Sequence, residues 1–137
     1  MGKKTEAYVD TSALIAFADR SDGHHALYRR LFSDPPALVT TTLVVAEGHG
    51  WFLKRYDRAR ALHFVTLVEA LTPMRVVAVG PDEQAGGFRM LRKFSDQDLS
   101  LTDAVGLHTM QVLRIGHCWS TDRHLGLTGV SLASDAH

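Results

Sequence analysis

Two aspartates follow apolar, strand-like stretches of the chain at the point where each stretch ends. Asp10 closes the stretch AYVD, and Asp122 comes directly after HCWST. In open α/β sheets, ligands bind outside the carboxyl ends of the strands, so both carboxylates are expected at the same edge of a sheet. Carboxylate oxygens are the ligands that Mg²⁺ and Mn²⁺ prefer. A turn or helix cap explains either aspartate alone, but the matched placement favours a site.

Two further acids have unusual settings. Glu47 interrupts the apolar run TTTLVVAEGHGWF, which predicts a mostly buried helix. A buried glutamate is costly unless it is paired or coordinates a metal, and the alternative is a glutamate on the helix surface. Asp103 follows Ser100 by three residues, which fits a helix-capping box. Capping therefore competes with a role for Asp103 in a site.

Strand-like and helix-like stretches alternate along the chain, which predicts an α/β fold with a parallel sheet covered on both faces. The tail, residues 131–137, is expected to add an edge strand or to fray. The helix over 57–71 has the clearest apolar side, while Pro81 marks a helix start. The pattern predicts strands over 6–10, 37–40, 74–79 and 117–121, and helices over 12–19, 25–33, 42–56, 57–71, 81–94 and 100–115.

Length and composition are those of an ordinary globular protein. The 137 residues are expected to form a single domain, and 15 basic residues balance 15 acidic ones, which does not indicate non-specific binding of nucleic acid. No apolar stretch approaches the length of a membrane span, and no secretory signal is evident, so a cytosolic protein is expected. The single cysteine, Cys118, excludes an internal disulfide and a cysteine zinc cluster. The eight histidines are scattered and are expected to be ordinary surface or packing residues.

Four stretches, VDTSALIAF, TTTLVVAE, FSDQDLSLTDA and STDRHL, occur in this order along the chain. In that order they resemble the PIN-domain ribonucleases, and most closely the VapC-type toxins of type II toxin–antitoxin pairs. The resemblance spans almost the whole chain. It implies a PIN-like three-layer α/β/α domain over residues 1–137, with a central, mainly parallel sheet.

The same resemblance implies which residues form the site. The acidic cluster of the family falls on four positions that would bind metal and take part in catalysis, and two hydroxyl residues fall where small side chains support it. Asp96 and Asp98 also lie in a family-like stretch, although either also fits a role in capping a turn. The four acids are Asp10, Glu47, Asp103 and Asp122, and the two supporting residues are Ser12 and Thr121.

The activity implied by the resemblance is hydrolysis of RNA phosphodiester bonds by an endoribonuclease that uses Mg²⁺ or Mn²⁺. Crowded carboxylates repel one another unless a cation compensates them, which agrees with a metal site. The family further implies an RNA substrate, a homodimer and a cognate antitoxin protein, with no membrane. Two alternatives stay open: a PIN-type RNA-processing nuclease without an antitoxin, and a catalytically inactive PIN-like binding module.

Basic residues gather in three clusters on the expected helices. Each cluster is explained by a solvated helix face, or by a surface that guides RNA phosphates to an acidic pocket. The clusters are Arg29 and Arg30; Lys54, Arg55, Arg58 and Arg60; and Arg89, Arg92 and Lys93. Trp51, Phe52 and Trp119 lie in apolar runs and are expected in the core or an interface rather than against bases.

Overall fold

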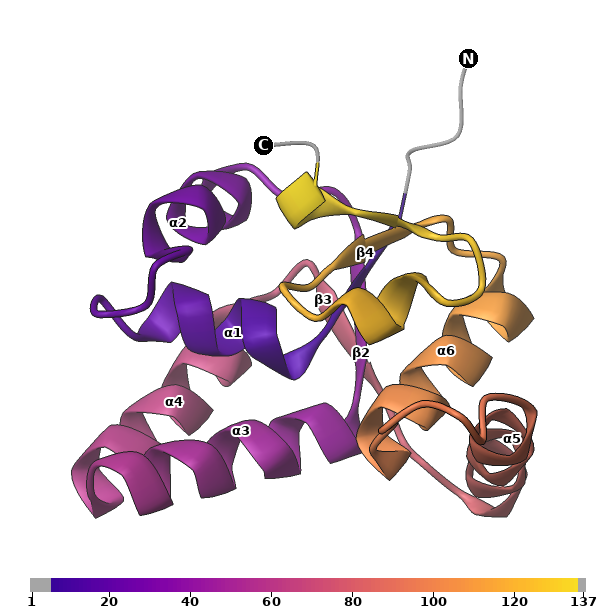
Figure 1. Ribbon diagram of the computed structural model, residues 1–137. Helices are drawn as coiled ribbons and strands as arrows, with labels where there is room; N and C mark the ends of the chain where they lie inside the picture. Colours follow the sequence, from indigo (N-terminus) through magenta and orange to yellow (C-terminus); the bar gives the residue numbers. More distant parts are fainter. Residues whose placement is uncertain (1–5, 136–137) are drawn as a thin grey trace.

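A computed structural model describes residues 6–135. Its centre is a five-stranded sheet in the order β3-β2-β1-β4-β5, in which every neighbouring pair is parallel (Figure 1). The predicted parallel sheet is confirmed, and the tail supplies the edge strand. The strands are β1 (Ala7–Val9), β2 (Leu38–Thr41), β3 (Met74–Val77), β4 (His117–Trp119) and β5 (Ser131–Leu132).

The six predicted helices are all present, with bounds that differ from the expected ones by no more than two residues at either end. Two short 3-10 helices, η1 (Arg123–Gly126) and η2 (Ala133–Asp135), were not anticipated by the pattern. None of the helices in the described part of the chain is long and apolar enough to cross a membrane. The helices are α1 (Thr11–Ala18), α2 (His25–Ser33), α3 (Thr42–Arg55), α4 (Arg58–Ala70), α5 (Pro81–Lys93) and α6 (Leu101–Leu113).

The helices cover both faces of the sheet. In Figure 1, α1 to α4 lie on one face, while α5 and α6 pack as a pair on the other. This arrangement follows from the right-handed crossovers that parallel strands require: the chain moves outward from β1 to β3, then returns past β1 to β4. The predicted three-layer α/β/α fold is therefore confirmed.

The core lies between the sheet and these helices. All three residues of β1 and all four of β2 are buried, as are Phe52 and Trp119, which confirms the core role expected for them. Gly48 is buried in α3 because the ring of Phe64, on α4, packs directly against its Cα, where a Cβ would clash. The glycine within this predicted helix is thus explained by close packing of α3 on α4.

The strand order reverses direction between β1 and β4. From β1 the chain goes on to β2 at one side, whereas β4 pairs with β1 at the other side. Ligands of open α/β sheets bind at such a switch point, outside the carboxyl ends of the strands. Both Asp10 and Asp122 follow these two strands, so the fold brings the two predicted positions to the same edge of the sheet.

Candidate active site at the carboxyl edge of the sheet

Asp10 is a buried carboxylate that joins β1 to α1. Its side chain caps the start of α1, where Oδ2 accepts a 2.7 Å hydrogen bond from Ser12 Oγ. Oδ2 also accepts a 2.9 Å bond from Ser120 Oγ, the first residue after β4. Burial raises the pKa of Asp10, and the hydroxyls of Ser12 and Ser120 partly oppose that rise. Asp10 is therefore both a cap and a member of a connected polar site.

The two hydroxyls that hold Asp10 also fix the loop after β4. Ser12 Oγ accepts a 3.0 Å bond from the backbone N–H of Thr121, and Ser120 Oγ accepts a 2.9 Å bond from that of Asp122. Of the two residues expected to support the site, Ser12 contacts Asp10 through its hydroxyl, whereas Thr121 enters this network through its backbone. Ser120 was not singled out, because its contact depends on the register that places Val9 beside Trp119.

Asp122 begins the 3-10 helix η1. Its Oδ1 accepts a 3.0 Å bond from the backbone N–H of His124 and lies 2.9 Å from His124 Nδ1. Single ligand atoms of Asp103, Asp122 and His124 all lie within 4.8 Å of one another. Nothing in the spacing of the histidines singles out His124. It joins the cluster because the tight turn of η1 folds its ring back onto Asp122.

Asp103 lies in the first turn of α6. The helix is capped through the backbone of Asp103, whose N–H donates a 3.1 Å bond to Ser100 Oγ. Asp103 is buried as a residue, with 8% of its surface exposed, and its side chain is partly buried. Burial raises its pKa to about 7, with further contributions from the charges of Asp10, Asp122 and Glu47, while a hydrogen bond with Ser100 lowers it. Capping and membership of the acidic cluster are therefore both present.

Glu47 lies on α3, and the expectation that it is buried is wrong: its side chain is exposed. The buried residues of α3 are Val44, Gly48 and Phe52, which recur every four residues and leave Glu47 at the rim. Its charge nevertheless raises the pKa of Asp103. Glu47 is thus near enough for its charge to act on Asp103, although it lies outside the close group of Asp103, Asp122 and His124.

Asp96 and Asp98 are exposed in the loop that precedes α6.

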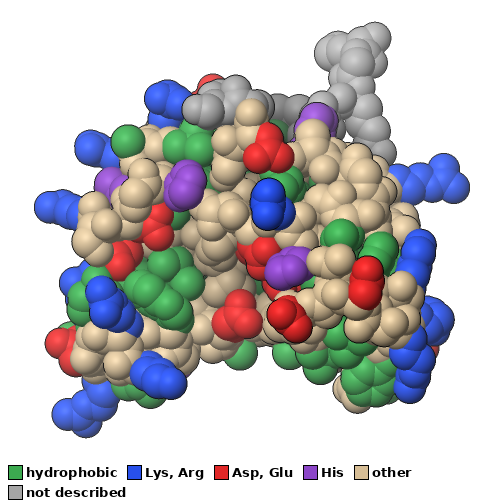
Figure 2. Space-filling view, viewed as in Figure 1, with side chains coloured by type: hydrophobic (Ala, Val, Ile, Leu, Met, Phe, Trp, Pro, Cys, Tyr) green, Lys and Arg blue, Asp and Glu red, His purple; other side chains and the backbone are tan. Residues whose placement is uncertain are grey.

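A cavity of about 620 Å³ opens beside the cluster, lined by Asp122, His124 and Thr121 together with Gln97, Arg123 and Leu127. Figure 2 shows acidic side chains gathered around a hollow near the middle of the face that it presents. The cluster is therefore accessible from solvent.

Comparison with known proteins identifies this arrangement. The model of the PIN domain family matches residues 7–128. The chain belongs to the PIN domain family. It is 27% identical over 124 residues to the 23S rRNA-specific endonuclease VapC20 of Mycobacterium tuberculosis, a match that covers 89% of this chain and 93% of that protein.

Solved structures agree on the fold of this PIN domain. The structure of VapC20 from M. tuberculosis, described as a Sarcin-Ricin loop cleaving toxin, has a TM-score of 0.82 at 23% identity, covering 90% of this chain and 95% of its own. A toxin–antitoxin complex from Klebsiella pneumoniae has a TM-score of 0.63 at 19% identity, covering 92% and 94% of the two chains. At these identities the likeness supports the PIN fold.

The acidic cluster of this PIN domain suits a divalent cation. Among residues 6–135, no lysine or arginine forms an ion pair with any of the four acids, and the imidazole of His124 lies 2.9 Å from the carboxylate of Asp122. The charge of the cluster is thus left uncompensated by the protein, and it adds to the effect of burial in raising the pKa of Asp103. Carboxylate oxygens are the donors that Mg²⁺ and Mn²⁺ prefer, and the imidazole of His124 contacts the carboxylate of Asp122.

Proposed function

We propose that this PIN domain is a metal-dependent endoribonuclease, the toxin of a toxin–antitoxin pair. The observation that carries the proposal is the uncompensated acidic cluster at the switch point of a PIN-domain sheet. The relatives support it: VapC20 is named as a 23S rRNA-specific endonuclease, and the Klebsiella structure is a toxin–antitoxin complex. The substrate is RNA, and the reaction is hydrolysis of a phosphodiester bond.

In this proposal Asp10, Asp103 and Asp122 hold Mg²⁺ or Mn²⁺, and Glu47 contributes from the rim. An ion held by these residues would supply positive charge to offset the negative charge that develops on the phosphoryl group, and would favour ionisation of the attacking water. Hydrolysis forms one P–O bond to the water oxygen and breaks another P–O bond, and the proton passes to the leaving oxygen. His124 lies beside Asp122 and holds its carboxylate in place.

The remaining residues position these groups. Ser12 and Ser120 fix the buried carboxylate of Asp10 by two short hydrogen bonds. Gln97 and Arg123, in the cavity beside Asp122, offer an amide and a guanidinium to the nucleotides next to the cleaved bond. Thr121 supports the site through its backbone N–H, which is fixed by Ser12.

We further propose that residues 1–137 form one domain that works as a homodimer and is inhibited by a separate antitoxin protein. Apolar side chains of the α5–α6 pair, Phe88, Leu101 and Val112, are exposed and offer a surface for a second copy. An antitoxin that covers the acidic cluster would exclude both RNA and the cation.

The test is cleavage of a mixed pool of structured RNA with Mg²⁺ or Mn²⁺, compared with the same reaction in a chelator. Loss of a residue that only hydrogen-bonds to a metal ligand lowers activity roughly 10- to 100-fold. Asp10→Asn removes a proposed ligand itself, so metal-dependent cleavage should fall by more than this. Asp34→Asn is the matched control, because Asp34 is exposed and lies outside the cluster. Unchanged cleavage by Asp10→Asn, or equal cleavage in chelator, would contradict the proposal.

A further inference from the structure

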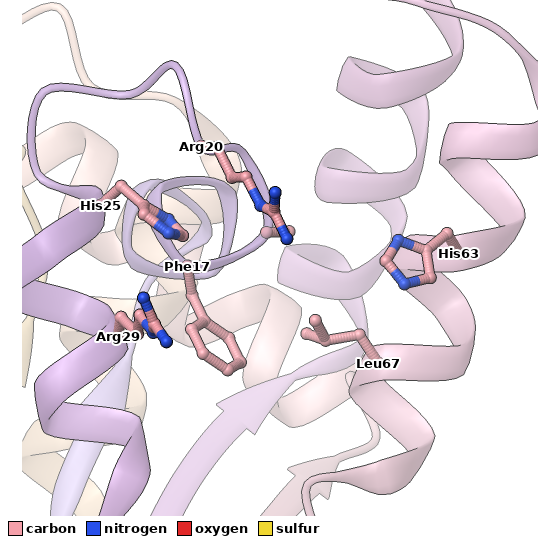
Figure 3. A pocket seen from close by; sticks show the side chains of 7 residues that line it. Phe17, Arg20, His25, Arg29, His63 and Leu67 are labelled. Atoms are coloured by element: carbon pink, nitrogen blue, oxygen red, sulfur yellow. The ribbon is translucent and has the colours of Figure 1, made fainter.

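A second polar cavity lies at the far end of α1 from the acids. It has a volume of about 550 Å³ and opens between the turn that joins α1 to α2 and the exposed side of α4. Figure 3 shows the side chains that point into it from these elements. We call it the basic cleft, and its lining includes Arg20, His25, Arg29 and His63 over a floor of Phe17 and Leu67.

The basic cleft carries positive charge that is not neutralised within it. Arg20 and Arg29 are exposed, and neither forms an ion pair in the described part of the chain. An adjoining cavity shares Arg20 and His63 and adds Arg60, which there lies near the carboxylate of Asp19. Arg29 and Arg60 come from separate basic clusters of the sequence, and the fold brings them to two adjoining cavities.

The acids nearest to the cleft already accept hydrogen bonds from groups other than the arginines of the cleft. Asp19 is buried and accepts hydrogen bonds from Ser21 Oγ at 2.7 Å and from Tyr56 Oη at 2.9 Å. Asp22 accepts a 2.8 Å bond from the backbone N–H of His24. Neither carboxylate lies within 4.0 Å of Arg20, so the guanidinium groups keep their donors for a ligand.

Several side chains of the cleft and of the adjoining cavity are held in place before any ligand binds. His25 Nδ1 lies 2.8 Å from the backbone oxygen of Ala16, which fixes the ring. The ring of Phe17 stacks on Phe32 with centroids 4.4 Å apart. The guanidinium of Arg60 lies 4.3 Å from the centre of the Tyr56 ring. Such fixed groups lose less conformational freedom when they bind a ligand.

Helix α1 sets the distance between the cleft and the acids. Asp10 caps its first residue, and Phe17 and Ala18 at its end line the cleft. Eight residues of helix span about 12 Å. This distance is short enough for one RNA strand to contact the acids and the cleft at the same time.

We propose that the basic cleft binds phosphate groups of the RNA strand a few nucleotides from the bond that is cleaved at the acidic cluster. This inference rests on the proposed function. Planar guanidinium groups suit phosphate oxygens, and a floor of one aromatic and one aliphatic side chain suits a ribose or a base. RNA is favoured over an acidic protein segment because the cleft lies one helix length from the acids, along the path of a strand that occupies both.

The first measurement is binding of a fluorescein-labelled RNA oligonucleotide of mixed sequence, in chelator, over a series of salt concentrations. Arg20→Ala/Arg29→Ala removes two charges of the cleft, and the slope of log K against log salt should become shallower by about 1.4, or about 0.7 for each lost phosphate contact with a single strand. Arg89→Ala/Arg92→Ala, on the exposed surface of α5, removes equal charge elsewhere and should keep the wild-type slope. Arg20→Lys/Arg29→Lys should also keep it.

The second measurement is cleavage of the structured RNA pool with Mg²⁺, where the Arg20→Ala/Arg29→Ala variant should raise KM about tenfold for each lost contact, with kcat unchanged. Equal salt slopes for the cleft variant and the α5 control, with normal cleavage, would overturn the inference and leave the nuclease proposal standing. Failure of the wild type to cleave, with the difference in slope preserved, would refute the nuclease proposal instead. Loss of polyglutamate binding in the cleft variant, with RNA binding unaffected, would identify an acidic protein as the occupant and also overturn the inference.

Discussion

The acidic cluster should cost the metal-free protein stability, and Asp103→Asn tests this directly. Asn has nearly the same shape as Asp but carries no charge. The substitution also leaves the cap of α6 intact, because that cap is made by the backbone N–H of residue 103 and the hydroxyl of Ser100. We therefore expect Asp103→Asn to stabilise the metal-free protein at alkaline pH while it lowers nuclease activity.

The pKa of Asp103 gives the sign and the size of the effect. It is raised from its ordinary 3.8 to about 7, chiefly by burial and then by the charges of Asp10 and Asp122. Between these pH values the folded protein binds the proton and the unfolded chain does not, so the free energy of unfolding falls as pH rises from about 4 to about 7. At about 1.4 kcal/mol for each pH unit, the loss is at most about 4 kcal/mol. Screening by water at the open side of the cluster reduces it to about 2–4 kcal/mol.

The measurement is urea unfolding of the wild type and of Asp103→Asn in chelator at pH 4.5, 6 and 8. Other titrating groups cancel in the difference between the two proteins, which should grow by about 2–3 kcal/mol over this range in favour of the variant. Asp34→Asn, an exposed carboxylate outside the cluster, should show a difference that changes little with pH. A difference for Asp103→Asn that is constant with pH would refute the assignment of Asp103 to a repulsive cluster.

Two further predictions concern residues that position the site. Ser120→Ala removes a hydroxyl that donates to the buried carboxylate of Asp10, so we expect a loss of about 1–3 kcal/mol in unfolding free energy and weaker RNA cleavage; normal stability and activity would show that Ser12 alone suffices. Gly48→Ala places a methyl group against the ring of Phe64 and should destabilise the protein by about 1–3 kcal/mol in urea unfolding. Gly50→Ala, in the same helix but facing open space, should instead stabilise it by about 0.5–1 kcal/mol, and equal effects of the two substitutions would contradict the packing argument.

The order and type of the elements could be predicted because local signals agreed with the final packing. The apolar side expected of the helix over 57–71 is the side that α4 buries, with Ala61 and Phe64 in the core. Pro81 begins α5 as expected, with acids in the first turn. The 3-10 helix η1 escaped prediction because it is stabilised by one side chain, that of Asp122, rather than by an apolar pattern.

The site could be predicted only in part. Asp10 and Asp122 could be predicted because each follows a strand, and this placement does not depend on the register between the strands. Ser120 and His124 were not, because their contacts require knowledge of how β1 pairs with β4 and how tightly the chain turns after it. Glu47 shows the opposite error: a buried setting was inferred from apolar neighbours, but the burial of a helix face depends on its rotation against α4 and the sheet.

The acids and the basic cleft occupy opposite ends of α1, and the helix itself favours that division. The N-terminal end of a helix carries partial positive charge, which stabilises the carboxylate of Asp10 at the cap, while the C-terminal end favours cations such as the guanidinium of Arg20. Asp19 lies at the unfavourable end, and it is tied there by Ser21 and Tyr56. A cation bound at one end and a phosphate bound at the other would each meet the complementary charge. One short helix would thus separate the two kinds of charge that a nuclease needs, a negative pocket for metal and a positive surface for RNA, and hold them a fixed distance apart.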